Sequence, residues 1–454
     1  MVGGGGPPSG VAAGGMMGAR VTPIGVWQVV PDQEYPVGQD RLLRLALKLP
    51  AHWRIADAKL TDFDPEMVAR DQSLTRYRGR LDVVLEPVTG PLPCPECGKS
   101  SRRYDSRPLQ TWEHLGLFDY RTYLHAAPVR VDCEAHGVRT VAMPWARPGS
   151  GFTLEYELRV LDLARQMPVH ALAGTLGVSD HRLWRVVHHW ASILRRNVSM
   201  QNVRRIGIDE KSSRRGHKYV TIVVDLDTRK VIFATQGRQS SVLTEFCSAL
   251  EAGGGSRESI TQVTMDMSAA FRAGVERELP NAQIVFDKFH VVKLANDAVD
   301  EVRRQEQKEV RELKGSRYVW LHNPDSLSHR QQAQMAELLH TPLKTARAYS
   351  LRLQLQEFYE NVPSEEALKL WYSRAIRSKI DPIKTVARTI KRHWHGVLLG
   401  ATTRVTNAVL EGVNSVVQAA KSRARGYRRV QNMINMIFLL FYPLDRLLAT
   451  RSVK

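Results

Sequence analysis

The sequence predicts a multidomain α+β protein with an N-terminal zinc-binding domain, a helix-turn-helix, and an α/β core that an all-α segment interrupts. Three observations support this prediction. The chain has 454 residues, which is too long for one ordinary hydrophobic core. Two short cysteine motifs lie in its first third. Strands alternate with helices in its middle, as in α/β domains.

The charge balance favours a polyanionic partner. Lys and Arg number 65 against 46 Asp and Glu, which gives a formal net charge of +19. Basic proteins of this kind bind nucleic acid by releasing its counterions. The longest apolar run, around residues 437–442, is too short to cross a membrane. We therefore expect no membrane partner. Four cysteines are too few for a disulfide scaffold, so we also expect a reducing compartment.

Residues 1–40 are predicted to be a disordered, Gly-rich leader. The stretch up to Ala19 lacks the basic start and the apolar centre of a signal peptide. Met16 and Met17 close it and suggest that translation begins there. An intact mass that included Met1 would contradict this hypothesis.

A zinc-binding domain is predicted over residues 41–148, beginning with strand-like alternation up to Leu85. Cys94-Pro-Glu-Cys97-Gly is a tight turn, and Cys133-Glu-Ala-His136-Gly repeats its spacing with His in the last place. Two such turns can supply the closed tetrahedron of thiolate and imidazole ligands that structural Zn²⁺ requires.

Two alternatives remain open for this motif. The three cysteines can be reduced thiols beside a surface histidine, without any metal. His114 and His125 also compete with His136 for the place of the fourth ligand.

A helix-turn-helix is predicted over residues 152–198, after a Pro- and Gly-rich linker at 144–151. A first helix covers residues 154–165, Pro168 opens a second in its first turn, Gly177 ends it, and Ser179 caps a third. The third helix should bury Leu183, Val186 and Val187. Its outward side chains, candidates for DNA contact, are Arg182, Arg185 and His189, with His188 beside them. The alternative is an ordinary helical hairpin with solvated arginines.

The pattern then changes to that of an α/β domain, predicted over residues 203–294 and 401–446. Strands are expected at 203–208, 219–224, 231–234, 262–265 and 283–286, and helices at 241–251 and 269–279. Charged amphipathic helices fill residues 295–400, which we interpret as an all-α insertion.

Three carboxylates stand out in this core. Asp209 and Asp266 each follow an apolar run that is expected to end there, and Glu411 lies on a helix after the insertion. Converging carboxylates can hold two Mg²⁺ ions, with Mn²⁺ as an alternative, for phosphodiester chemistry. Each acid alone is more often a cap or a solvated side chain. The order of elements, however, is typical of a ribonuclease H-like nuclease core.

Other acids near these positions are interpreted as structural: Glu210, and the hairpin residues Asp225 and Asp227. Asp287 and His290 follow the last strand of the core. They can hold substrate or metal, but a capping aspartate with a packed histidine explains them equally well, so neither is counted as catalytic.

Several blocks of this chain resemble the ISL3 family of bacterial insertion-sequence transposases, from about Leu42 onward. They are IGIDEKS from Ile206, GHKY from Gly216, TMDM from Thr264, IVFDKFHVVK from Ile284, LEGVN from Leu410 and ARGYR from Ala424. The resemblance implies that Asp209, Asp266 and Glu411 bind the catalytic metals. It also implies a zinc finger, a helix-turn-helix and an interrupted nuclease fold. The second half of the finger departs from the family, since it offers only Cys133 and His136.

The function expected from this resemblance is Mg²⁺-dependent DNA cleavage and strand transfer at the inverted ends of an insertion sequence. The partner would be double-stranded DNA, both as the element's ends and as the target. Further copies of the chain would assemble with it on that DNA. The location would be the nucleoid in a bacterial cytoplasm. Candidate DNA contacts after Glu411 are Arg425, Tyr427 and Arg428, with Arg429 next to them. The alternatives are a nuclease or resolvase without strand joining, a DNA-binding regulator derived from an inactive transposase, and an RNA-processing factor.

Overall fold

A computed structural model describes residues 39–214, 218–361, 363–403 and 408–443. Most of the expected leader, the expected residues 444–446 of the core and two residues of the GHKY block therefore lie outside the described residues. Residues 39 and 40, which were assigned to the leader, begin helix α1 (Gln39–Ala46).

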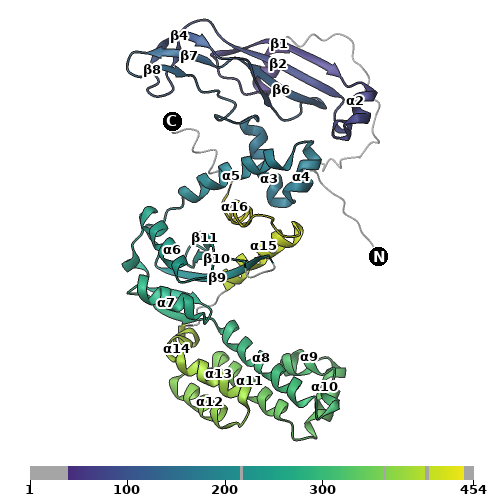
Figure 1. Ribbon diagram of the computed structural model, residues 1–454, viewed down its shortest axis with the longest axis vertical. Helices are drawn as coiled ribbons and strands as arrows, with labels where there is room; N and C mark the ends of the chain where they lie inside the picture. The colour runs from purple at the N-terminus through teal and green to yellow at the C-terminus, as the bar shows by residue number, and fades with distance from the viewer. Residues whose placement is uncertain (1–38, 215–217, 362, 404–407, 444–454) are drawn as a thin grey trace, which may run out of the picture.

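The described chain is arranged as a row of units (Figure 1). Two β-sheets form one end, the helix-turn-helix helices follow, a mixed sheet occupies the middle, and a group of helices forms the other end. None of the helices in the described ranges is long and apolar enough to cross a membrane.

The N-terminal domain contains the first sheet, ordered β1-β2-β6-β5. Its strands are β1 (Trp53–Asp62), β2 (Gly79–Pro87), β5 (Gln110–Glu113) and β6 (Tyr120–Ala126), and α2 (Pro65–Arg70) and the 3₁₀ turn η1 (Gln72–Arg76) join the first two. Edge-to-face packing of Trp53 and Trp112 against Trp145 fills its core, with ring centroids 4.7 and 5.7 Å apart. Trp145 belongs to the linker, so this core also fixes the start of the next unit.

The second sheet is ordered β3-β4-β7-β8. Its strands are β3 (Leu92–Pro93), β4 (Ser100–Ser106), β7 (Val129–Cys133) and β8 (Gly137–Thr140). Only four buried side chains form its core: Leu92, Val129, Val131 and Val141. So small an apolar core stabilises a sheet poorly without a further crosslink.

The three predicted helices of the helix-turn-helix are present as α3 (Leu154–Gln166), α4 (Val169–Leu176) and α5 (Asp180–Arg196). Gly177 ends α4 in the left-handed conformation, with φ 64°, which glycine adopts without steric cost. Ser179 precedes α5 as expected, although its side chain makes no capping hydrogen bond. Pro168 is the N-cap residue of α4 and not part of its first turn.

The middle sheet is ordered β11-β10-β9-β12-β13. Its antiparallel strands are β9 (Arg205–Arg214), β10 (Lys218–Asp225) and β11 (Lys230–Gln236), and β12 (Gln262–Met265) and β13 (Gln283–Phe286) continue it in parallel. Helices α6 (Ser241–Ala252) and α7 (Ala269–Glu278) and the 3₁₀ turn η2 (Arg257–Ser259) connect them. The prediction that the first strand ends before Asp209 is wrong, because β9 stays paired with β10 through Arg214.

The helical segment differs from its predicted boundaries at both ends. Helix α8 (Lys288–Glu306) runs unbroken through residue 295, and α14 (Trp394–Thr403) packs on β13. Between them lie the helices α9 (Arg317–Leu321), α10 (His329–Leu339), α11 (Lys344–Glu360), α12 (Glu365–Arg377) and α13 (Asp381–Arg392), and the 3₁₀ turns η3 (Arg311–Leu313) and η4 (Pro324–Ser326).

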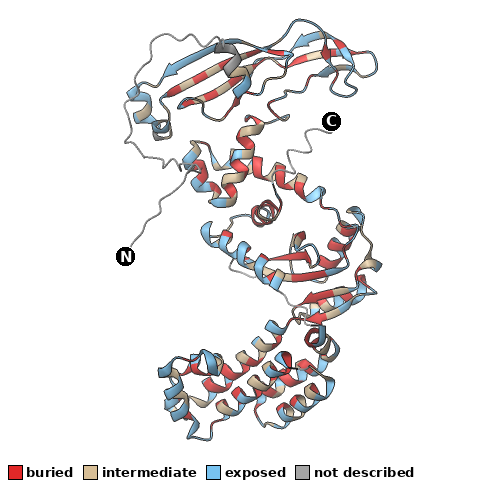
Figure 2. Ribbon diagram, turned by 180° about the vertical axis from the view of Figure 1, so that it is seen from behind, coloured by how far each residue is buried: buried red, intermediate tan, exposed pale blue. Residues whose placement is uncertain are grey.

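Two final helices return to the sheet. Helix α15 (Ala408–Arg423) packs on β9, and α16 (Val430–Phe441) packs on both α5 and β11. The Tyr442 hydroxyl donates a hydrogen bond of 2.9 Å to the Val231 carbonyl on β11. Figure 2 shows buried residues running along α5, α16 and the sheet. The helix-turn-helix and the sheet therefore share one apolar core.

Candidate functional site

The sheet brings two of the predicted carboxylates side by side. Thr264 of β12 lies opposite Gly207 of β9, and the same register carried two residues further sets Asp266 level with Asp209. Neighbouring strands are about 4.8 Å apart, and residues two apart share a face. The two aspartates therefore meet on the face of the sheet that Gly207 shares.

Helix α15 covers this face. A Cβ on Gly207 would lie 2.6 Å from Cδ1 of Leu410, so the helix approaches as closely as it does only because residue 207 is glycine. One turn further along α15, the Asn414 amide donates a short hydrogen bond to Oδ2 of Asp209. The Asp209 side chain is also 3.4 Å from the Lys211 ammonium, and its Oδ1 accepts the Glu210 N–H at 2.7 Å.

Glu411 lies on the same helix, between Leu410 and Asn414, but it is exposed. Among the described residues, only the cysteine cluster brings three or more potential ligand atoms within 4.8 Å of one another. Asp209, Asp266 and Glu411 are therefore further apart than a shared ion would hold them. Glu411 therefore lies on the helix that packs on β9, and among the described residues no contact joins it to either aspartate.

Asp266 lies in a turn directly after β12. Its Oδ1 accepts the Ser268 N–H at 3.0 Å, and Ser268 caps α7. Burial raises the pKa of Asp266, the negative charge of Asp209 adds to this, and the Ser268 hydrogen bond and His290 oppose it. A carboxylate whose pKa is raised by burial and by a neighbouring negative charge is a favourable place for a cation.

Three more ionisable groups, which sequence reasoning treated as structural or left open, lie beside this pair. Asp287 is level with Asp266, because Phe286 pairs with Met265, and it caps α8 by accepting the Phe289 N–H at 3.2 Å. His290 lies 3.1 Å from Asp287, and that contact, followed by the charges of Asp209 and Asp266, raises its pKa.

Glu210 also belongs to the cluster. Burial and then the charge of Asp266 raise its pKa. Strand register is the signal that could have found Asp287 beside Asp266, because residues that immediately follow adjacent parallel strands lie at one edge of a sheet.

The chemistry of these side chains suits a hard cation. Oδ1 of Asn414 is buried and has no hydrogen-bond partner among the described residues, although the amide lies against Asp209. Carboxylate and amide oxygens are the ligands that Mg²⁺ takes. An unpaired buried oxygen beside two carboxylates therefore fits a magnesium site.

The second cluster consists of Cys94, Cys97, Cys133 and His136, whose ligand atoms all lie within 4.8 Å of one another. The Sγ atoms of Cys97 and Cys133 are 3.7 Å apart, and Nδ1 of His136 is 3.7 Å from the Cys133 sulfur. A tetrahedral zinc with bonds of about 2.3 Å to sulfur sets its ligands roughly 3.8 Å apart. The cluster therefore has the spacing of a structural zinc site and could bind that ion.

Local geometry supports this arrangement. Gly98 and Gly137, which follow the two motifs, have φ of 72° and 65°, as a tight ligand turn requires. A hydrogen bond with His136 lowers the pKa of the Cys133 thiol to about 6. The thiolate is the metal-binding form.

The two rival histidines have other partners. His114 is buried and lies 2.8 Å from the Thr153 hydroxyl, and His125 lies 2.6 Å from the Asp82 carboxylate on β2. Of the three candidates for the fourth ligand, only His136 belongs to the cluster.

The predicted DNA-facing side of α5 is partly covered in this structure. The Arg182 guanidinium lies 4.2 Å from the Phe152 ring and 3.4 Å from the buried Glu113 carboxylate. Arg185 donates to the Gly149 carbonyl at 3.2 Å. His189 is half-buried, and this burial lowers its pKa. Arg182, whose side chain keeps 41% of its surface exposed, and His189 are therefore partly covered on this side, whereas Arg185 is exposed.

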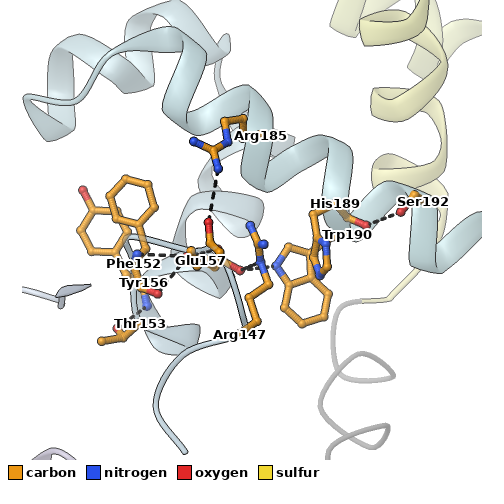
Figure 3. Close-up of polar contacts among 11 residues, drawn as sticks. Arg147, Phe152, Thr153, Tyr156, Glu157, Arg185, His189, Trp190 and Ser192 are labelled. Carbon is orange, nitrogen blue, oxygen red and sulfur yellow. Dashed lines mark hydrogen bonds and ion pairs between the residues drawn. The ribbon is translucent and has the colours of Figure 1, made fainter. Parts of the chain in front are cut away.

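Figure 3 shows why the linker stays on this side of α5. The fully buried Glu157 accepts hydrogen bonds from Arg147 at 2.9 Å, from the Trp190 indole at 2.8 Å and from the Ser150 hydroxyl at 2.6 Å. A buried carboxylate with three donors has its desolvation compensated. This contact ties residues 147–150 of the linker to α3 and α5.

The adjacent side of α5 faces a cleft of about 780 Å³, which we call the α5–α16 cleft. His181, Trp184, Arg185 and His188 line it from α5. Arg423 at the end of α15 lines it too, with Ala424, Gly426, Tyr427, Arg428 and Arg429 of the turn between α15 and α16. Of the candidate contacts, Tyr427 and Arg428 line this cleft, and Arg425 lies in the turn with φ 52°.

Comparisons with known proteins agree with this arrangement. A family model described as a transposase matches residues 206–437, and one described as the helix-turn-helix domain of transposase family ISL3 matches residues 141–191. The transposase for insertion sequence element IS1557 of Mycobacterium tuberculosis is 29% identical over 432 residues, which cover 88% of this chain and 95% of that protein. The transposase for IS1001 of Bordetella parapertussis is 28% identical over 360 residues, 77% of this chain and 88% of that protein. With both its helix-turn-helix and more than half of its length matched in this way, the chain belongs to the ISL3 family of transposases.

Proposed function

We propose that this chain cuts DNA at the ends of an insertion sequence and joins those ends to target DNA. Asp209, Asp266 and Glu411 would hold the magnesium ions, with Asn414 as a further oxygen ligand. The observation that carries the proposal is the level placement of Asp209 and Asp266 on neighbouring strands, beneath the helix that bears Glu411.

The five-stranded sheet supports a ribonuclease H-like assignment for the catalytic core. Three antiparallel strands are followed by two parallel ones, in the order β11-β10-β9-β12-β13. The helical segment after β13 then separates the two aspartates from Glu411 in sequence. This order of strands and helices supports the assignment.

Bound magnesium supplies the Lewis acidity that phosphodiester cleavage needs. In the first reaction, water attacks a phosphodiester at the element's end and leaves a 3′-hydroxyl. In the second, that hydroxyl attacks a phosphodiester of the target strand. Asp209 and Asp266 would fix where the reacting phosphate lies. Lys211 would offset part of their negative charge, and His290, whose pKa the contact with Asp287 raises, lies beside them.

The other units would supply DNA binding. The net charge of +19 and the helix-turn-helix favour duplex DNA as partner. We assign the zinc domain and the helix-turn-helix to the element's inverted ends, and the helical insertion to flanking DNA. Because an element has two ends, the working form would be a homo-oligomer on DNA, at the bacterial nucleoid.

The test is Mg²⁺-dependent cleavage and joining of DNA that carries the element's ends, with Asp266→Asn compared with the native chain. We expect Asp266→Asn to lose both products by at least roughly a thousandfold while binding DNA as before. Asp227→Asn is the matched control, because Asp227 makes an exposed ion pair with Arg205 and lies outside the cluster.

The alternatives predict different outcomes. Cleavage without joined products from the native chain would indicate a nuclease or resolvase. Binding without any metal-dependent product would indicate a regulator, and equal activity of Asp266→Asn and the native chain would refute the assignment of the site.

A further inference from the structure

The α5–α16 cleft joins the helix-turn-helix to the catalytic domain. One wall is the side of α5 that the linker leaves uncovered, and the other is the turn that follows the helix bearing Glu411. Arg423 fixes this geometry, since it donates to the carbonyls of Arg165 at 3.2 Å and Gln166 at 2.5 Å, at the end of α3. The two walls are therefore held at a set distance.

The lining combines aromatic rings with cations. Trp184 and Tyr427 meet edge to face across the cleft, with ring centroids 6.4 Å apart, and His188 lies 5.8 Å from Trp184. The apolar side chains Met167, Val169 and Met436 line it beside them. Burial raises the pKa of Tyr427 to about 12, so its hydroxyl stays protonated and able to donate. No other described residue hydrogen-bonds to that hydroxyl.

The rim is cationic. Arg428 and Arg429 are exposed, and neither has a hydrogen bond or ion pair with any residue in the described ranges. The one carboxylate among the lining residues, Asp180, lies 3.2 Å from Nδ1 of His170. An anionic group at the mouth of the cleft therefore meets uncommitted guanidinium groups, which suit phosphate.

The volume of the α5–α16 cleft limits which ligands can bind in it. A cleft of about 780 Å³ is in the range of small-ligand sites, roughly 300–1,000 Å³, and cannot admit a whole duplex. A planar apolar ring against Trp184 and Tyr427, with a phosphate on Arg428 or Arg429, describes one nucleotide. Aromatic side chains bind unpaired bases in this way because every base has a π-face.

We propose that the α5–α16 cleft binds a single unpaired nucleotide of the DNA strand, with its base against Trp184 and Tyr427 and its phosphate on the arginine rim. This inference rests on the proposed function, because it names the form of DNA that the protein takes. Arg423 follows Glu411 by 12 residues on α15, about 18 Å along a helix axis. The unpaired nucleotide would therefore lie about five base steps from the cut.

The experiment compares three labelled DNA probes at one salt concentration: a 25-base-pair duplex, the same duplex with one bulged thymine, and the same duplex with a five-thymine 3′ overhang. We expect the native chain to bind a probe with an unpaired thymine at least fivefold more tightly than the paired duplex. A preference for the bulge indicates a nucleotide leaving a duplex, and a preference for the overhang alone indicates a strand that is already single. Equal binding of all three probes would overturn the proposal.

Substitutions in the cleft test whether it causes the preference for unpaired DNA. Tyr427→Ala should bring the ratio of affinities close to one, and Tyr427→Phe, which keeps the ring, should retain it. Tyr318→Ala is the matched control, since Tyr318 is an exposed tyrosine on α9 in the helical segment. A ratio that survives in both Tyr427→Ala and Trp184→Ala would refute the assignment to this cleft.

Two further measurements keep the proposal testable if Tyr427→Ala does not fold. Permanganate oxidises an unpaired thymine, and in the native complex the bulged thymine should become unreactive; full reactivity there would contradict the proposal. Free dTMP should compete only at millimolar concentration, and displacement of DNA at micromolar dTMP would indicate a site for soluble nucleotides instead. Asp266→Asn should keep the preference for unpaired DNA, so loss of cleavage and loss of the cleft are separable.

Discussion

Asn414 connects the helix α15 to the strand β9 through one hydrogen bond to Asp209, and it leaves an amide oxygen unpaired. If that oxygen is a magnesium ligand, its removal should weaken ion binding more than the chemistry. We expect Asn414→Ala to raise the Mg²⁺ concentration for half-maximal cleavage roughly tenfold, the effect typical of a supporting ligand. A magnesium titration of cleavage measures this, with Gln418→Ala, an exposed position one turn further along α15, as control. An unchanged midpoint would remove Asn414 from the site.

His114 makes stability depend on pH. Burial lowers the pKa of His114 below its ordinary value of 6.5. The Thr153 hydroxyl, which accepts the Tyr156 N–H, can donate its proton to Nδ1 of the neutral ring at 2.8 Å. Between the two pKa values the unfolded chain binds more protons than the folded chain, so stability rises with pH. The folded state therefore loses stability as the pH falls below about 6.5.

We expect His114→Gln to flatten this dependence while lowering stability at neutral pH. Urea unfolding of the N-terminal domain between pH 5 and 8 measures the slope, with His170→Gln as an exposed control. An equally steep slope in His114→Gln would show that other groups carry the effect. His189 and His393, whose pKa values burial also lowers, contribute in the same direction.

At the level of elements, α14 and β13 are the tightest junction between the sheet and the helical segment. A Cβ on Gly400 would lie 2.5 Å from the Phe286 carbonyl oxygen, which is backbone and cannot move aside cheaply. We expect Gly400→Ala to destabilise the chain by about 1–3 kcal/mol. Gly174→Ala on α4, where nothing lies within 4 Å, should instead gain about 0.5–1 kcal/mol. Thermal unfolding of both variants measures these changes in stability. A more stable Gly400→Ala variant would contradict the close contact between α14 and β13.

The bounds of the elements also show how much of the fold can be predicted from the sequence. The bounds of β12 and β13 match the prediction, because short β-branched runs between turn residues specify them locally. The end of β9 does not match, since its partner β10 holds it extended through Arg214. The contacts of Arg182 with Glu113 and Phe152 could not be predicted from the pattern of α5, because both residues are far away in sequence.

Some residues of the candidate site could likewise be predicted from local sequence, and others could not. Asp209 and Asp266 were proposed from apolar runs that precede an acid, a local signal. Asp287 and His290 could not be separated from a cap and a packed side chain, because their position depends on register between strands. The zinc cluster was predictable from spacing, and the choice of His136 over His114 and His125 required the fold.

At the scale of the whole molecule, the sizes of the apolar cores predict that zinc, if bound by the cysteine cluster, stabilises only the sheet around it. The sheet that bears the cysteines has a core of four side chains, whereas the catalytic sheet shares a large core with the helix-turn-helix. Removal of zinc by a chelator should therefore unfold β3, β4, β7 and β8 and leave β9 to β13 folded. Hydrogen exchange measures protection in both sheets.

Variants of cysteine provide the matched comparison. Cys97→Ser should lower the zinc content and the protection of the small sheet only. Cys247→Ser should leave zinc unchanged, because Cys247 is buried under the catalytic sheet on α6. Loss of protection throughout the chain on chelation would show that the two sheets do not fold independently.

The position of α16 has a consequence for the order in which the molecule is made. Helix α16 is the last described helix to leave the ribosome, yet it packs between α5 and β11, which are made about 200 residues earlier. Until it is synthesised, the parts of α5 and β11 that α16 covers are exposed, and the helix bearing Glu411 has only just been made. At about 5–20 residues per second, the interval is on the order of ten to forty seconds. In a nascent chain, the contacts that α16 makes between the helix-turn-helix and the five-stranded sheet are therefore absent until residues 430–441 have been synthesised.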